Sequence, residues 1–208
     1  MKKGIYCLEN MWTSSVKNKL SVFPILELLE NANICEHLYH RCATREELIF
    51  MLHKWKSKSI QKKYPILYFA FHGEKAGITL NNKDVLTIDE LGNLLEDSCH
   101  GKVLFFASCE TLQMHGKRIQ TFLEKTGAIA AIGYKIEVGW MLATAFELLV
   151  LNALQEDKFD SKGIKNVRLI VNSEYGKLHT LLNFRMIINN KIHFPRKRKK
   201  TILVRKVN

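Results

Sequence analysis

Two short, very apolar runs with abrupt polar ends constrain the fold of this chain more than any other feature. They are Ile66 to Phe71, followed by the pair His72-Gly73, and Val103 to Ala107, followed by the pair Ser108-Cys109. An uninterrupted apolar run of five or six residues is typical of a parallel strand that is buried on both faces. Because catalytic groups of open α/β sheets lie just beyond the carboxyl ends of such strands, we expect these two pairs at one sheet edge.

The rest of the chain alternates between further strand and helix patterns. Strands are predicted at Lys3 to Leu8, Ile34 to Tyr39, Ala128 to Gly133 and Phe184 to Ile188. Helices are predicted from Pro24 to Leu29, Thr44 to Lys56, Thr87 or Asp89 to Glu96, Gln120 to Lys125, Glu137 to Gln155 and Asn166 to Leu182. This alternation predicts an α/β fold with a mostly parallel sheet of about six strands and helices on both faces.

Local signals refine two of these regions. Thr44 and Glu47 have the spacing of a capping box at a helix start, and Lys54 to Lys63 forms a basic connector to the next strand. Gly77 to Leu80 and Val85 to Thr87 are short alternating runs around an Asn/Asp turn. They predict a small β-hairpin after the third strand.

The basic charge of the chain is concentrated at its end. Seven of the 32 Lys and Arg residues lie in Arg196 to Lys206, and without those seven charges the net +12 becomes +5. We therefore divide the chain into one globular domain over residues 1–194 and a basic tail over 195–208. The segment Arg196 to Lys200 suggests nucleic acid or another acidic partner, and a solvated terminus is the alternative. No aromatic residues interleave the charges, which disfavours base stacking.

The five cysteines are odd in number, and no secretory segment precedes them, so we expect free thiols in a cytoplasmic protein. The long apolar run Trp140 to Leu154 is interrupted by Glu147, which favours a core helix over a membrane span. A group of four side chains, Cys35, His37, His40 and Cys42, is of the types that bind metal ions. On a strand, however, Cys35 and His37 would face one side and His40 and Cys42 the other. We therefore expect a structural role for these four residues and no metal site.

The order of these motifs resembles the caspase-like (clan CD) cysteine peptidases, which include caspases, metacaspases, separase and the bacterial CHAT peptidases. The resemblance covers about residues 3–188, and two motifs carry it: Phe71-His72-Gly73-Glu74, and Cys109, 37 residues after the histidine. The segment Gly127 to Gly133 and the helix after it are similar to CHAT domains. The resemblance implies a three-layer α/β/α caspase-haemoglobinase-like fold.

The same resemblance implies the roles of individual residues. Cys109 matches the nucleophile and His72 the general acid and base, while the N–H groups of Gly73 and Cys109 would form the oxyanion hole. No cofactor is implied. The expected activity is that of a cytoplasmic endopeptidase that cleaves a protein partner, as a regulated effector in bacterial antiviral defence or cell death, with a regulatory protein partner.

The substrate pocket departs from the caspase pattern. Where caspases have Gln-Ala-Cys-Arg-Gly, this chain has Ala107-Ser108-Cys109-Glu110-Thr111, so Ala107 replaces the glutamine that helps to hold a substrate aspartate. The loop from Glu9 to Lys19 contains no arginine. Aspartate specificity is therefore not expected. Glu9 and Glu137 both follow strand ends, where they could meet a basic P1 side chain, as acids do in the Arg-cleaving members.

Other functions compete with this interpretation. The fold could be a catalytically inactive caspase-like module that engages a protein or nucleic-acid partner through its sheet edge and basic tail. Nucleic-acid binding could also be the primary activity. Ser108 could be a hydrolase nucleophile, but the chain lacks a Gly-x-Ser-x-Gly elbow.

Overall fold

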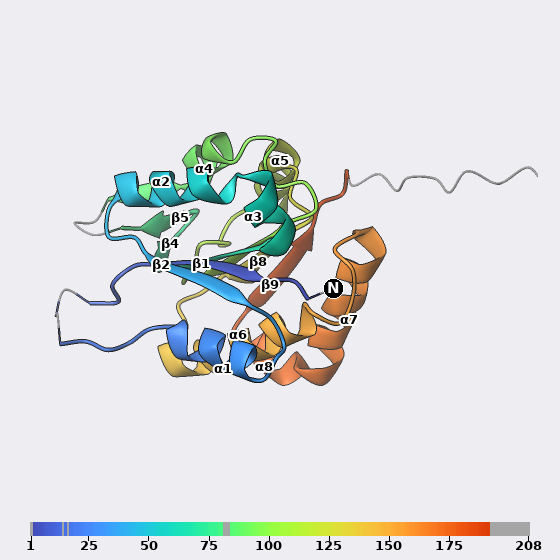
Figure 1. Ribbon diagram of the computed structural model, residues 1–208. Coiled ribbons are helices and arrows are strands. Elements are labelled where there is room, and N and C mark those ends of the chain that lie inside the picture. Colours follow the sequence, from blue (N-terminus) through green and yellow to red (C-terminus); the bar gives the residue numbers. More distant parts are fainter. Residues whose placement is uncertain (1, 14, 16, 81–83, 192–208) are drawn as a thin grey trace, which may run out of the picture.

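A six-stranded sheet forms the centre of the computed structural model, which describes residues 2–13, 15, 17–80 and 84–191 (Figure 1). The strand order is β2-β1-β3-β7-β8-β9, and every neighbouring pair is parallel except β8 and β9. The strands are β1 (Ile5–Glu9), β2 (His37–Arg41), β3 (Ile66–Ala70), β7 (Val103–Ala107), β8 (Ala130–Tyr134) and β9 (Phe184–Ile188). The prediction of a mostly parallel six-stranded sheet is confirmed.

Helices cover both faces of this sheet, as Figure 1 shows. One layer contains α2 (Arg45–Trp55), α3 (Lys58–Lys63), α4 (Ile88–Leu94) and α5 (Gly116–Thr126). The other contains α1 (Phe23–Asn31), α6 (Trp140–Ala153), α7 (Ser161–Glu174) and α8 (Gly176–Leu181). The architecture is therefore the expected three-layer α/β/α fold. No helix in the described part of the chain is long and apolar enough to cross a membrane.

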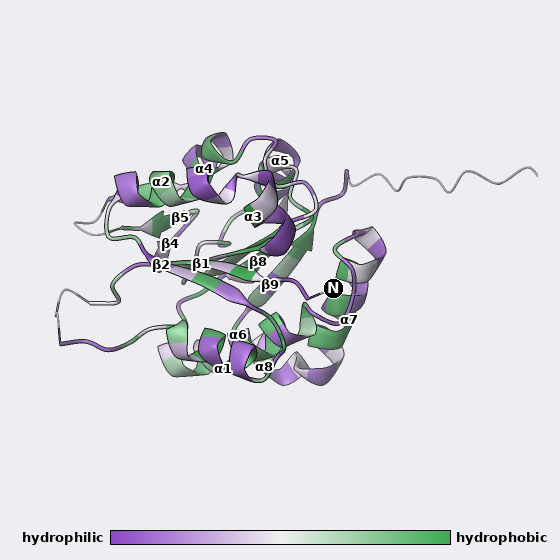
Figure 2. Cartoon of the chain, viewed as in Figure 1, coloured by the Kyte–Doolittle hydropathy of each residue, from purple (hydrophilic) through white to green (hydrophobic). Residues whose placement is uncertain are grey.

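Two hydrophobic cores, one on each face, explain why the four inner strands β1, β3, β7 and β8 are buried along their whole length. Along β1, Ile5 and Cys7 pack into one core, while Tyr6 and Leu8 pack into the other. Successive side chains of a strand point to opposite faces, so a strand between two helical layers has no position that favours a polar residue. In Figure 2 hydrophobic, green segments lie along the central strands, while the edge strand β2 carries hydrophilic, purple segments.

The capping signal at one helix start is confirmed, whereas several other predicted bounds change: the helix predicted from Asn166 to Leu182, for example, is divided into α7 and α8. The capping box of Thr44 and Glu47 is present at the start of α2, and Gly127 ends α5 with a φ of 74°. Strand β2, however, begins at His37 and not at Ile34. The N–H groups of Ile34 and Cys35 both donate to the carbonyl of Leu29, which closes the end of α1 before the strand can start. The basic connector also contains a helix, α3.

A second, three-stranded antiparallel sheet stands beside the main one. The predicted hairpin is confirmed as β5 (Gly77–Thr79) paired with β6 (Val85–Thr87), although residues 81–83 of its turn lie outside the described residues. The structure adds a third strand, β4 (His72–Glu74), which pairs with β5. The small sheet thus carries the histidine and the glycine that follow β3.

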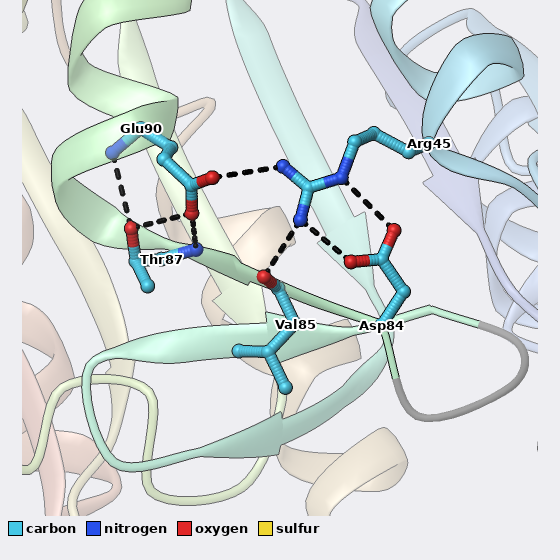
Figure 3. A network of polar contacts seen from close by, with 5 residues as sticks. All are labelled: Arg45, Asp84, Val85, Thr87 and Glu90. Carbon is cyan, nitrogen blue, oxygen red and sulfur yellow. Dashed lines mark hydrogen bonds and ion pairs between the residues drawn. The ribbon is translucent and has the colours of Figure 1, made fainter.

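Arg45 of α2 fixes this small sheet in place (Figure 3). Its guanidinium donates to both carboxylate oxygens of Asp84, at 2.9 and 2.6 Å, and to the carbonyl oxygen of Val85 at 2.8 Å. It also contacts Glu90, which caps α4 through Thr87. One side chain therefore connects α2, β6 and α4, so the position of the small sheet is set by the main fold.

Candidate functional site

The site lies where two neighbouring parallel strands end. Strands β3 and β7 are paired with Ala70 opposite Ala107, and His72 and Cys109 each follow two residues later. Both residues line one cavity of about 190 Å³ at this edge of the sheet. This register places the histidine and the cysteine at the same edge of the sheet, as expected.

The main chain of Gly73 lies directly against that of Cys109. A Cβ atom on Gly73 would fall 2.0 Å from the carbonyl oxygen of Cys109 and 2.9 Å from its amide nitrogen. Only glycine allows such an approach. The absence of a side chain at Gly73 therefore lets the small sheet pack on the loop that carries Cys109, and the two residues expected to form the oxyanion hole lie side by side.

Thr111 anchors the loop that carries the cysteine. Its hydroxyl donates to the carbonyl oxygen of Gly77 at 2.9 Å and lies 2.7 Å from the hydroxyl of Ser108. A threonine has one hydroxyl hydrogen, so Ser108 is the donor in the second bond. Ser108 is 2% exposed, and this bonded, buried hydroxyl offers no support for Ser108 as a nucleophile.

His72 is oriented by the loop after β1. Its Nε2 atom lies 2.7 Å from the carbonyl oxygen of Trp12, and the indole ring stands edge-on to the imidazole with centroids 5.4 Å apart. A carbonyl oxygen accepts only, so Nε2 carries the hydrogen in this contact. In the neutral imidazole, Nδ1 is then the proton acceptor.

The thiol of Cys109 is half-buried, and its surroundings oppose ionisation. Burial raises the pKa of the thiol, the backbone N–H of Val138, 3.4 Å from Sγ, lowers it, and the carboxylates of Glu137 and Glu110 raise it again. The net result is a pKa above the usual value for cysteine. The resting group is the thiol, which needs a base to become a nucleophile.

Glu9 is placed differently from the expected specificity acid. It is fully buried, and its carboxylate accepts hydrogen bonds from Trp12 Nε1 at 2.6 Å, Ser21 Oγ at 2.6 Å, Val22 N at 2.8 Å and the Tyr39 hydroxyl. Buried carboxylates need such donors. In the described part of the chain, Glu9 is not among the residues that line the cavity. Glu9 therefore anchors the loop after β1. It holds Trp12, whose carbonyl oxygen contacts His72.

The other two expected pocket residues do line the cavity. Ala107 forms part of its wall, and Glu137 reaches it from an exposed position before α6. Glu137 precedes Val138, whose N–H donates to the cysteine sulfur. The structure thus brings both residues into the neighbourhood of Cys109.

Sequence reasoning missed a second carboxylate in the same cavity, that of Glu147 in α6. Its two oxygens accept hydrogen bonds from the hydroxyls of Tyr68, at 2.5 Å, and Tyr134, at 2.9 Å. Burial raises the pKa of Glu147 to about 7, while the two hydroxyl donors work in the opposite direction. The available signal in the sequence was a lone acid inside an apolar helix.

Metal binding finds no support in the part of the chain that the structure describes. There, no three His, Cys, Asp or Glu side chains converge in a way that could hold a metal ion. Cys35 and Cys42 are buried in different cores, which agrees with their expected structural role. The basic tail from Pro195 onward lies outside the described residues.

Comparison with solved structures supports the fold assignment. The structure is similar to the Drosophila initiator caspase Dronc, with a TM-score of 0.50 and 10% sequence identity over 79% of this chain and 70% of that one. At this identity, the likeness concerns the fold alone. No curated protein matches the sequence. The model of DUF6642, described as a family of unknown function, matches residues 2–188, and the chain therefore belongs to this family, with a caspase-like fold.

Proposed function

We propose that this protein is a cysteine endopeptidase in which Cys109 is the nucleophile and His72 the general acid and base. One observation carries the proposal: the two side chains line a single small cavity at the carboxyl edge of the sheet, with the main chain of Gly73 packed on Cys109. Perturbed ionisable groups gathered in a cleft are typical of catalytic sites. The caspase-like fold agrees with this chemistry without establishing it.

In the proposed reaction, Nδ1 of His72 takes the proton from the thiol of Cys109, because Nε2 is bonded to the carbonyl of Trp12. The thiolate attacks the carbonyl carbon of the scissile peptide bond, and the N–H groups of Gly73 and Cys109 stabilise the oxyanion. The C–N bond breaks, and the imidazolium returns the proton to the leaving amine. Water then hydrolyses the thioester and regenerates the thiol. No cofactor takes part.

The substrate and setting of this activity follow from the resemblance and remain part of the proposal. Ala107 and Glu137 are assigned to the substrate pocket, since both line the cavity, and Glu9 to support of the loop. We place the enzyme in the cytoplasm as a regulated effector of bacterial antiviral defence or cell death, comparable to CHAT peptidases. We also propose that it has a protein substrate and a regulatory protein partner, and that nucleic acid binds to Arg196 to Lys200.

A non-catalytic binding module is the second candidate, and the raised pKa of Cys109 favours it. Reactive cysteines usually have a lowered pKa. In this alternative, the edge strands β2 and β9 of the main sheet would pair with a partner. The two candidates differ in what they require of the thiol, because only the peptidase needs Cys109 to react.

A cleavage profile separates the two candidates. Lysate proteins are incubated with wild type, with Cys109→Ala and with His72→Ala, and new protein amino termini are identified by mass spectrometry. For a peptidase we expect a small set of sites that depend on Cys109, with turnover lower by roughly two to four orders of magnitude in His72→Ala. Thermal unfolding of all three proteins provides the folding control. Identical profiles for wild type and Cys109→Ala would reject the peptidase.

A further inference from the structure

The charge of the cavity beside Cys109 is unusual for so basic a protein. Two carboxylates contribute to its described lining, from Glu137 at an exposed position and Glu147 at a buried one, and no lysine or arginine does. The chain as a whole carries a net charge of +12. The acidic groups of this lining favour a cationic ligand.

Glu147 lies at the inner end of this arrangement. It is 3% exposed and projects from α6 between β3 and β8, where it meets Tyr68 and Tyr134. An ionised carboxylate offers about four acceptor positions on its two oxygens. The two tyrosine hydroxyls occupy one position on each oxygen, so acceptor capacity remains for a ligand.

Several apolar residues of the cavity lining suit an aliphatic stem. Val22, Ala107 and Ala143 line the cavity together with the aromatic ring of Trp12. A volume of about 190 Å³ is below the range of cavities that hold drug-sized ligands and fits a single side chain. Lysine and arginine have apolar stems with a cationic head, and would place the head at the buried end.

We propose that Glu147 is the specificity-determining residue of the site and that it binds the cationic side chain of a lysine or arginine at the P1 position of the substrate. This inference rests on the proposed peptidase function. Glu137, being exposed, contributes a weaker and salt-screened attraction to the same charge. An aspartate at P1 would instead meet two carboxylates, so the pocket has the opposite preference to one built for acidic residues.

The energetics of Glu147 agree with a functional role. A carboxylate held in a core costs stability relative to an apolar residue of similar size, because it loses its hydration. The pKa of Glu147, raised to about 7 by burial, expresses this cost. A bound ammonium or guanidinium would supply the missing counter-charge and favour the ionised form.

Binding to an inactive variant tests the assignment without requiring catalysis. Two peptides that differ only at P1, with arginine in one and its neutral isostere citrulline in the other, are titrated into full-length Cys109→Ala by calorimetry. We expect the arginine peptide to bind at least about 30-fold more tightly, the scale of a desolvated charge pair. Adding Glu147→Gln should bring the ratio close to one. Adding Glu156→Gln, an exposed position outside this cavity, should leave it unchanged.

A second measurement covers the case in which Glu147→Gln does not fold. If the cation binds a carboxyl group that is partly protonated in the empty site, binding releases protons near pH 6.5. Calorimetry in two buffers of different ionisation enthalpy measures this release, which we expect for the arginine peptide and not for citrulline. Equal release, a ratio unaffected by Glu147→Gln, or binding of neither peptide would overturn the proposal.

The pocket and the peptidase fail in distinguishable ways. Cleavage by wild type that depends on Cys109 but follows residues other than lysine and arginine would refute the pocket and leave the peptidase standing. The expected binding pattern in Cys109→Ala, combined with no cleavage by wild type, would refute the peptidase and leave the cation pocket standing.

Discussion

A Cβ atom on Gly73 would lie 2.0 Å from the carbonyl oxygen of Cys109, so the strand that carries the histidine and the loop that carries the thiol pack main chain to main chain. The contact couples the two halves of the candidate site through backbone atoms, which cannot relax by rotating a side chain. The geometry of the site therefore depends on a residue that has no side chain.

Gly73→Ala should separate these two segments. The added methyl group overlaps backbone atoms, so we expect a loss of about 1–3 kcal/mol in the free energy of unfolding, as for other overpacked sites. Displacing the reacting groups by about 1 Å should also lower peptide cleavage by roughly 100-fold. Urea denaturation and a peptide assay measure the two effects. Gly176→Ala is the matched control, because its Cβ would meet no atom within 4 Å; equal behaviour of the two variants would contradict the role of the contact.

Thr111→Val tests the anchor of the nucleophile loop. Valine keeps the shape of threonine but removes the hydroxyl that bonds Gly77 and Ser108, leaving two buried polar groups without this partner. We expect a destabilisation of about 1–3 kcal/mol and slower cleavage. Thr121→Val removes a hydroxyl bond on the exposed surface of α5 and should cost much less. Comparable losses in both variants would mean that the buried network contributes little.

Selective alkylation should identify Cys109 among the five cysteines. Its thiol is the only partly exposed one, and the other four, Cys7, Cys35, Cys42 and Cys99, are buried. Iodoacetamide on the native protein should add one label, absent from Cys109→Ala, as read by intact mass. Because the pKa of Cys109 is raised above its ordinary value, the labelling rate should still be rising at pH 9. A rate already constant at neutral pH would indicate a thiolate and contradict the described environment.

Glu147 should make the stability of the fold depend on pH. Its pKa is about 7 in the folded protein against 4.5 for the ordinary carboxyl, so between these values the folded state binds more protons than the unfolded one. The free energy of unfolding should therefore fall as pH rises from about 4.5 to about 7, by an amount on the order of 3 kcal/mol. The ionisable groups facing it, Tyr68, Tyr134, Cys7 and Cys109, all have raised pKa values and stay neutral in this range.

Urea denaturation at pH 5 and pH 8 measures this dependence. The amide of Glu147→Gln can accept from one tyrosine hydroxyl and donate to the other, and it cannot ionise. The drop should therefore be smaller in this variant by the stated amount. Other groups titrate equally in both proteins and cancel in the comparison. Glu156→Gln should retain the wild-type drop. An identical drop in all three proteins would show that the ionisation of Glu147 does not contribute to the pH dependence of the free energy of unfolding.

The sequence alone predicted the central strands and their chemical ends. The bounds of β7 agree with the predicted range and those of β3 differ by one residue, because a strand buried on both faces is a continuous run of apolar residues in the sequence. The bounds of the edge strand β9 also agree. The same physics predicted His72 and Cys109 at one sheet edge. Boundaries set by helix termination were less predictable: the start of β2 depends on hydrogen bonds to Leu29, which no hydropathy pattern encodes.

Only the tertiary structure decided which acid belongs to the pocket. In the sequence, Glu9 and Glu137 follow strand ends, while Glu147 interrupts an apolar helix. In the fold, the carboxylate of Glu9 is used by the loop after β1, and that of Glu147 reaches the cavity between two tyrosines. Strand periodicity is a local property that one chain segment determines, whereas the partner of a buried charge depends on which distant segments pack around it.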